Sequence, residues 1–369
     1  MNTAFHPSLF QINTRVWLTE LSQGLGRPAT LDDIPDTELE RLAEMGLDWI
    51  WLLSVWQTGP AAQSVSRTNL DWRHQFEETL PDLRETDIAG SGFAIADYTV
   101  HSRLGGDAAL ARLRERLKQR GLRLLLDFVP NHMAPDHRWV EQHPDYFVHG
   151  SDADFAKAPQ NYCRVRTSRG PLVLAYGRDP YFDGWPDTLQ LNYGNPNLQR
   201  AMIGELLRIA KQCDGVRCDM AMLVLPEIFE RTWHIHVELF WPQATQRVRK
   251  QFPRFTFMAE VYWDMEWTLQ QQGFDYAYDK GLYDRLREGL AAGARASVRG
   301  ARLPAEACSV FGEPRRAPGR CDLHARDAPS RGDCDLPFAW AAVLPSGSVP
   351  GAEKAHLATL DPCATGAGE

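Results

Sequence analysis

Apolar and polar positions alternate along the 369-residue chain in two periods, one strand-like and one helix-like. Short apolar runs, typical of buried strands, alternate with longer segments whose apolar residues recur every three or four positions, as on one face of a helix. We predict strands at residues 10–17, 49–55, 122–129, 215–219 and 255–261, a weaker strand at 274–278, and helices at 36–44, 107–120, 197–212 and 238–251. This order favours right-handed strand–helix–strand units and therefore a parallel sheet or barrel.

Two segments interrupt the alternation. Residues 132–191 are rich in Pro, Gly, Asp and aromatic residues and contain no long periodic helix. A loop of this length inside a compact domain usually forms a functional subdomain. Residues 294–369 contain no Ile, Met, Asn, Gln or Tyr, and four of the seven cysteines lie there. A disordered tail is the simplest interpretation of that composition.

Composition narrows the classes of function. A net charge of −8 argues against nucleic-acid binding, because no basic face is available to neutralise phosphates. No apolar run approaches the roughly 20 residues of a membrane span, and the first seven residues do not resemble a signal peptide. The odd number of cysteines, without paired metal spacing, favours a reduced cytoplasmic chain. The 12 tryptophans suit a carbohydrate site and a Trp-rich core about equally.

The predicted strand at residues 122–129 is followed by polar residues. The C-terminal ends of strands form the active face of a barrel, so Asp127, Asn131 and His132 are expected there. The alternative is that Asp127 and Asn131 only cap a turn around Pro130.

Two further strands end in charged residues. Arg217 and Asp219 are two positions apart on a strand, so both side chains point to the same face, and a cation beside a carboxylate keeps it ionised, as a nucleophile requires. An ordinary ion pair at a strand end is the alternative. Glu260 follows an apolar strand among aromatic residues, and apolar surroundings raise a carboxyl pKa, as a general acid requires. A strand-end glutamate that faces water is the alternative there.

Taken together, the order and spacing of these segments resemble the amylase-type glycoside hydrolase family (the α-amylase family, glycoside hydrolase family 13). Residues 127–132 (DFVPNH), 215–219 (GVRCD) and 258–260 (MAE) look like the family's motifs on strands three, four and five. Residues 92–98 (GFAIADY) resemble the segment before strand three, and residues 10–17 (FQINTRVW) resemble its first strand. The resemblance covers about residues 8–290.

The resemblance implies roles for individual residues. Asp219 would be the nucleophile and Glu260 the general acid/base, with Arg217 keeping Asp219 ionised. His132 would bind a hydroxyl of the sugar in the cleavage subsite, and Phe93 stands where the family usually has a sugar-stacking tyrosine. The implied substrate-binding residues are His132, Phe93, Asp97 and Tyr98.

The implied fold is a (β/α)8 TIM-type barrel with a small insertion domain after strand three. Its parts would be residues 1–131 (strands one to three), 132–191 (the insertion), 192–293 (strands four to six) and 294–369 (an aberrant tail). The family's insertion often binds calcium, so Ca²⁺ is the one cofactor that the resemblance suggests, although no convincing ligand set stands in the sequence.

The implied reaction is retaining hydrolysis of α-glucosidic bonds in an oligo- or polysaccharide. Relatives in the family instead transfer the sugar to another acceptor or isomerise it, and the sequence does not separate these outcomes. A catalytically dead sugar-binding barrel is the alternative of another class, although such a protein would not need the pair Asp219 and Glu260.

The family's third carboxylate, in an Asn-His-Asp phrase that ends strand seven, does not occur after Glu260. Residues 310–316 (VFGEPRR), read one base later through synonymous codons, give FLENHDE, and residues 348–353 (SVPGAE) give QFPGQ in the same frame. Both strings resemble family phrases in the expected order. We therefore hypothesise that the reading frame slipped near residues 285–295. The tail would then not be a domain, strands seven and eight would be lost, and the chain as written would be impaired.

Overall fold

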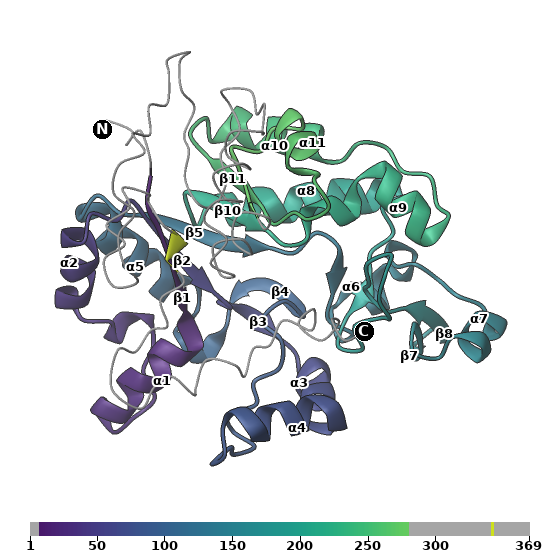
Figure 1. Ribbon diagram of the computed structural model, residues 1–369, viewed down its shortest axis with the longest axis horizontal. Helices are drawn as coiled ribbons and strands as arrows, with labels where there is room; N and C mark the ends of the chain where they lie inside the picture. Colours follow the sequence, from purple (N-terminus) through teal and green to yellow (C-terminus); the bar gives the residue numbers. More distant parts are fainter. Residues whose placement is uncertain (1–6, 280–340, 343–369) are drawn as a thin grey trace, which may run out of the picture.

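The computed structural model describes residues 7–279 and 341–342. Its centre is a seven-stranded sheet in which all neighbouring strands run parallel (Figure 1). The strands are β1 (Leu9–Asn13), β2 (Trp49–Leu53), β5 (Arg123–Phe128), β10 (Gly215–Cys218), β11 (Thr256–Ala259), β12 (Tyr276–Ala277) and β13 (Ala341–Ala342). Their order across the sheet is β12-β11-β10-β5-β2-β1-β13. From β1 to β12, each strand of this sheet therefore lies beside the next one along the chain, as in a (β/α) barrel.

Helices follow the strands and pack around the sheet (Figure 1). They are α1 (Thr14–Leu25), α2 (Asp36–Glu44), α5 (Gly106–Gln119), α8 (Pro196–Ala210), α9 (Pro226–Trp233), α10 (Trp241–Gln251) and α11 (Glu266–Gln271). In α5, the helical spacing buries Ala109, Leu110, Leu113 and Leu117. No helix within residues 7–279 is long and apolar enough to cross a membrane.

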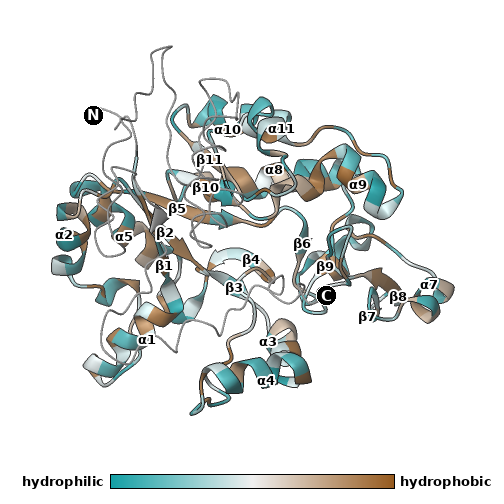
Figure 2. Cartoon of the chain, in the orientation of Figure 1, coloured by the Kyte–Doolittle hydropathy of each residue, from teal (hydrophilic) through white to brown (hydrophobic). Residues whose placement is uncertain are grey.

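The two faces of the sheet pack differently. One face joins the helices in the large hydrophobic core, whereas Trp49, Trp51, Leu53, Leu125 and Met258 form a separate small cluster on strands β2, β5 and β11. Alternate residues of a strand point to opposite faces, so the odd-numbered residues of β2 belong to the small cluster. Figure 2 shows how strongly apolar residues concentrate on the central strands.

Most predicted elements agree with the structure to within three residues at each end. The prediction for residues 10–17 is wrong in its second half, because β1 ends at Asn13 and α1 begins at Thr14. The Asn13 side chain accepts a hydrogen bond of 3.3 Å from the Val16 amide. This N-cap ends the strand despite the apolar residues that follow.

Residues 56–100 contain an excursion that the sequence pattern did not predict. Two helices, α3 (Pro60–Thr68) and α4 (Leu70–Thr79), lie between the antiparallel strands β3 (Trp56–Thr58) and β4 (Ile95–Val100). Short 3-10 helices complete the connections elsewhere: η1 (Leu31–Asp33), η2 (Ser102–Leu104), η3 (Pro144–Tyr146) and η4 (Ala221–Val224).

The segment 132–191 leaves the sheet between β5 and α8 and lies beside it (Figure 1). Its base is an antiparallel pair of two-residue strands, β6 (His132–Met133) and β9 (Leu189–Gln190). The rest consists of the short helices α6 (Trp139–Gln142) and α7 (Asp152–Lys157) and the hairpin of β7 (Tyr162–Thr167) and β8 (Gly170–Ala175). The prediction that this segment lacks a long helix is confirmed.

The predicted tail, residues 294–369, lies outside the described residues except for β13. That strand pairs in parallel with Leu9 and Phe10 of β1, on the side of β1 where a barrel would close. The other residues of the tail lie outside the described ranges, so the strands whose absence the frame-slip hypothesis predicts cannot be assessed. That hypothesis and the proposed domain boundaries therefore stay predictions.

Candidate active site

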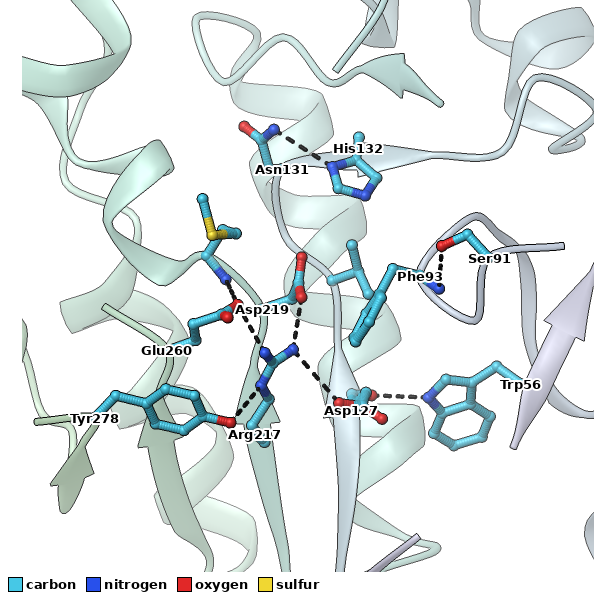
Figure 3. Close-up of polar contacts among 12 residues, drawn as sticks. Trp56, Ser91, Phe93, Asp127, Asn131, His132, Arg217, Asp219, Glu260 and Tyr278 are labelled. Carbon is cyan, nitrogen blue, oxygen red and sulfur yellow. Dashed lines mark hydrogen bonds and ion pairs between the residues drawn. The ribbon is translucent and has the colours of Figure 1, made fainter. Parts of the chain in front are cut away.

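Arg217 stands at the centre of a group of buried carboxylates (Figure 3). Its Nη1 lies 2.6 Å from Asp219 Oδ1 and 3.6 Å from Asp127 Oδ1, and its Nη2 lies 2.7 Å from Glu260 Oε2. All four side chains are 11% exposed or less. One cation is therefore shared by three carboxylates in surroundings that screen charge poorly.

Strand register accounts for this convergence. The strand β10 lies between β5 and β11, and Cys218 pairs with Ala259. Asp219 and Glu260 each come one residue later, at the same C-terminal edge of two adjacent parallel strands, as expected. We predict that their carboxyl groups lie about 5–6 Å apart, as in retaining enzymes.

Aromatic rings enclose the guanidinium of Arg217. The ring centroids of Trp51, Phe93 and Tyr278 lie 5.2, 5.1 and 5.6 Å from its central carbon. Nε of Arg217 also donates a hydrogen bond of 3.2 Å to the Tyr278 hydroxyl. Burial alone would lower the pKa of Arg217, but the carboxylates, Glu260 foremost, outweigh burial and raise this pKa. Arg217 is a permanent cation held from several sides.

Glu260 is held through both carboxyl oxygens. The Met220 amide donates to Oε2 at 2.8 Å, and the Tyr262 hydroxyl donates to Oε1 at 2.8 Å. Met220 has a φ of 41°, which is unusual for a residue with a side chain. Burial raises the pKa of Glu260 to about 7, although Arg217 opposes that rise. A carboxyl group with such a pKa can carry and release a proton near neutral pH.

Asp127 and Asp219 share the cation of Arg217 with Glu260. Burial also raises the pKa of Asp127 to about 7, against the opposing charge of Arg217. Asp219 has the shortest contact with Arg217, and this contact favours its carboxylate form. An ionised carboxylate next to a protonated one is the combination that a nucleophile and a general acid require.

His132 lies beside this group on the side of Asp219 (Figure 3). His132 is 3% exposed, and its ring makes a T-shaped contact with Trp185 at 5.3 Å between centroids. Burial lowers its pKa to about 3, so the imidazole is neutral. A hydrogen bond with the Phe93 backbone and the charge of Glu260 oppose this lowering without reversing it. Phe93 also faces the group, over Arg217.

Asp97 and Tyr98 do not join this group, and the prediction that they bind substrate needs correction. Asp97 forms ion pairs of 2.6 Å with Arg138 and 2.5 Å with Arg208. Tyr98 is 1% exposed, and its hydroxyl both donates to and accepts from the backbone of Val129. With these contacts satisfied inside the protein, both residues stabilise the scaffold instead.

Sequence reasoning did not single out Trp51, Tyr262, Tyr278 or the amide of Met220. Tyr262 lies two positions after Glu260, and this spacing could have indicated the contact between them. Trp51 is on β2 and Tyr278 directly follows β12, each two strands away from β10, and a single sequence does not reveal this order of strands.

The residues do not fit the calcium site that the resemblance suggested. Within the described ranges, no group of three His, Cys, Asp or Glu side chains could hold a metal ion. Calcium takes six to eight oxygen ligands, usually with carboxylates among them. At the base of segment 132–191, oxygens of Asn131 and Leu191 converge, but the amide nitrogen of Gln190 lies between them.

Comparison with known families identifies the family of this chain. The family model "Alpha amylase, catalytic domain" matches residues 30–277. The chain belongs to the alpha-amylase family. Among curated members, it is 34% identical to an alpha-1,4-glucan:maltose-1-phosphate maltosyltransferase of Salinibacter ruber over 36% of this chain and 20% of that protein. It is 26% identical to the alpha-amylase MalA of Haloarcula japonica over 60% of this chain and 29% of that protein.

A trehalose synthase/amylase TreS of Mycobacterium tuberculosis is 25% identical over 69% of this chain and 39% of that protein. The chain thus spans less than half the length of these curated relatives. Solved structures agree on the fold: an alpha-amylase from Lactobacillus plantarum has a TM-score of 0.55 at 22% identity, covering 82% of this chain and 61% of that chain. An alpha-amylase from H. orenii has a TM-score of 0.53 at 21% identity, covering 81% of this chain and 58% of that chain.

Proposed function

We propose that this site acts on α-glucosidic bonds of oligo- or polysaccharides by a retaining double displacement, with Asp219 as nucleophile and Glu260 as general acid/base. One observation carries the proposal. Two buried carboxyl groups at the ends of adjacent strands are bridged by the guanidinium of Arg217, which contacts them at 2.6 and 2.7 Å. The names of the alpha-amylase relatives support α-glucans as the substrate class.

In the first step, Glu260 gives its proton to the glycosidic oxygen while Asp219 attacks the anomeric carbon, so the bond to the leaving sugar breaks as a glycosyl–enzyme ester forms. The pKa of about 7 for Glu260 suits this role. In the second step, Glu260 removes a proton from water, which attacks the same carbon and releases Asp219. His132 would bind a ring hydroxyl, and Phe93 would contact the sugar face.

A second outcome of the same chemistry is transfer of the glycosyl group to another sugar. The relatives include a maltosyltransferase and a trehalose synthase, which supports glycosyl transfer as the alternative. Both outcomes pass through the ester at Asp219. Product analysis separates them, because hydrolysis releases a reducing sugar for each bond cleaved, whereas transfer does not.

We further propose that the chain as written is impaired. No Asn-His-Asp phrase follows Glu260, and two strings of the tail permit family phrases in a shifted frame. Without the third carboxylate, the site loses hydrogen bonds that strengthen as the oxocarbenium ion forms, a loss of several kcal/mol. The nucleotide sequence that encodes residues 280–320 tests this part directly.

Activity tests both parts. We compare the chain as written with a gene restored to the shifted frame, each with an Asp219→Asn variant, on α-glucan and p-nitrophenyl α-glucoside. The restored enzyme should cleave one substrate and lose activity in Asp219→Asn but not in Asp32→Asn, an exposed control. The chain as written should be no faster than its own Asp219→Asn variant.

The proposed chemistry and the proposed impairment can be contradicted separately. A restored enzyme that binds sugar without cleaving it, or cleaves it equally well in Asp219→Asn, contradicts the proposed chemistry and favours a sugar-binding barrel. Asp219-dependent turnover by the chain as written contradicts the impairment and shows that the tail is a working part of the protein.

A further inference from the structure

The base of segment 132–191 is a buried junction with the sheet. Strands β6 and β9 meet there, and His132 pairs with Gln190. The backbone of Leu191 donates to Asn131 O at 3.1 Å. Asn131, Gln190 and Leu191 have no solvent exposure. Polar atoms at this junction therefore depend mainly on partners within the protein.

The side-chain amide nitrogen of Gln190 lies among three oxygens. It donates to Asn131 Oδ1 at 2.9 Å, to Asn131 O at 3.0 Å and to Leu191 O at 3.1 Å. An amide has two hydrogens, so these three acceptors share them. The opposite amide orientation would turn Gln190 Oε1 toward the same oxygens, which would repel it. Oε1 itself has no partner within residues 7–279, so satisfying the three oxygens decides the orientation.

We propose that the Gln190 amide takes the place of a bound cation at this junction and, through Asn131, fixes His132 in the tautomer that carries its proton on Nε2. The first half concerns only the scaffold. The second half rests on the proposed function, because it gives His132 a donor for a substrate hydroxyl.

The oxygen cluster explains the first half. Oxygens that converge in a dry interior repel one another unless a cation or a hydrogen-bond donor stands between them. A hard cation such as Ca²⁺ would need oxygen ligands at about 2.3–2.6 Å and charge compensation from carboxylates. Gln190 supplies two polarised hydrogens instead, carries no net charge, and ties the end of segment 132–191 to the end of β5.

The second half follows from the bonding of Asn131. Because Asn131 Oδ1 accepts from Gln190, the other end of that amide, Nδ2, faces His132 Nδ1 at 3.4 Å. Nδ2 is a donor only, so Nδ1 must accept and cannot carry the proton. The neutral imidazole then has its hydrogen on Nε2. Gln190 is thus a positioning residue for His132.

Thermal unfolding of the full 369-residue chain, in excess Ca²⁺ and in EDTA, tests the first half. The wild-type midpoint should be the same in both. Gln190→Glu keeps the length of the side chain but adds a fourth oxygen and a charge. Its midpoint should fall by several degrees in EDTA and recover in Ca²⁺. Gln246→Glu, on the exposed face of α10, adds the same charge and should respond to neither.

Gln190→Met keeps the volume without donors or charge, so it should lose several degrees equally in Ca²⁺ and EDTA. Stabilisation of the wild-type chain by Ca²⁺ overturns the replacement of a cation. So does a Gln190→Glu midpoint that Ca²⁺ does not raise, or a Gln190→Met midpoint equal to wild type.

Nuclear magnetic resonance of ¹⁵N-histidine-labelled chain tests the second half without turnover, with the His132 signals assigned from a His132→Gln spectrum. In the wild-type chain, Nδ1 should resonate as an unprotonated nitrogen and Nε2 as a protonated one. Gln190→Met should weaken this preference and mix the tautomers. A wild-type signal with the proton on Nδ1, or an unchanged signal in Gln190→Met, overturns the assignment even if the proposed glycosidase activity is correct.

Discussion

Replacement of Arg217 by methionine is the most informative perturbation of the site, because it removes a cation shared by three buried carboxylates and leaves similar volume. The two shortest contacts, 2.6 Å to Asp219 and 2.7 Å to Glu260, would be lost together. Breaking one buried ion pair costs about 3–5 kcal/mol, because an uncompensated charge remains in the interior. The folded variant should avoid this cost by protonating a further carboxyl, foremost that of Asp219.

The magnitude then depends on pH. A carboxyl with an unfolded pKa near 4 that must stay neutral in the folded state costs about 5 kcal/mol at pH 8 and only about 1.5 kcal/mol at pH 5. The stability of the wild-type chain should depend on pH in the same direction, since burial raises the pKa of Asp127 and Glu260 to about 7. The folded state binds those protons more tightly than the unfolded state, so stability rises as pH falls from about 7 toward 4.

Urea unfolding followed by tryptophan fluorescence at pH 5 and pH 8 measures the effect. Arg217→Met should lower the free energy of unfolding by about 5 kcal/mol at pH 8 and by only about 1–2 kcal/mol at pH 5. The matched control is Arg112→Met, whose partner Asp32 is exposed, and it should lose at most about 1 kcal/mol at either pH. A loss below about 1 kcal/mol for Arg217→Met at pH 8, or an equal loss at both pH values, refutes this electrostatic reasoning.

Other predictions concern catalysis by the restored-frame enzyme and the stability of the scaffold. The kcat/KM of that enzyme should fall above about pH 7 as Glu260 loses its proton, and a flat profile from pH 6 to 9 would contradict the assignment. Tyr262→Phe removes a donor to the Glu260 carboxylate, so this basic limb should move to higher pH; a shift to lower pH would contradict the contact. Glu260→Gln should lose far more activity on α-glucan than on p-nitrophenyl α-glucoside, whose leaving group needs little protonation, whereas equal losses would argue against an acid role. Tyr98→Phe should lower the free energy of unfolding by about 1–3 kcal/mol without changing KM, and a changed KM would return Tyr98 to the substrate site.

Local pattern was sufficient for most of the sheet. Short apolar runs gave β2, β5, β10 and β11 to within two residues at each end, because buried parallel strands leave a strong signal of their own. The pattern failed at residues 14–17, where Asn13 starts a helix inside an apolar stretch. It also missed α3 and α4, because α3 buries only the small residues Ala62 and Ser66 and α4 buries only Phe76.

What the sequence determined by itself is which side chains stand at strand ends. Asp219 and Glu260 each come one residue after a strand, and the spacing of Arg217 and Asp219 alone placed both on one face. Tertiary structure decided which charged groups surround these side chains and how deeply they are buried. The register of β5, β10 and β11 brings Asp127 and Glu260 to the same guanidinium, and burial then raises the pKa of both carboxyls.

The same distinction separates residues of one motif. Phe93 and Asp97 lie four positions apart in the segment resembling the family, yet Phe93 covers Arg217 while Asp97 pairs with Arg138 and Arg208. Gln190 carried no signal in the sequence, because its importance depends on three oxygens that folding brings together. A side chain's type and local spacing are written in the chain, whereas desolvation and the number of neighbouring charges arise only when distant segments pack.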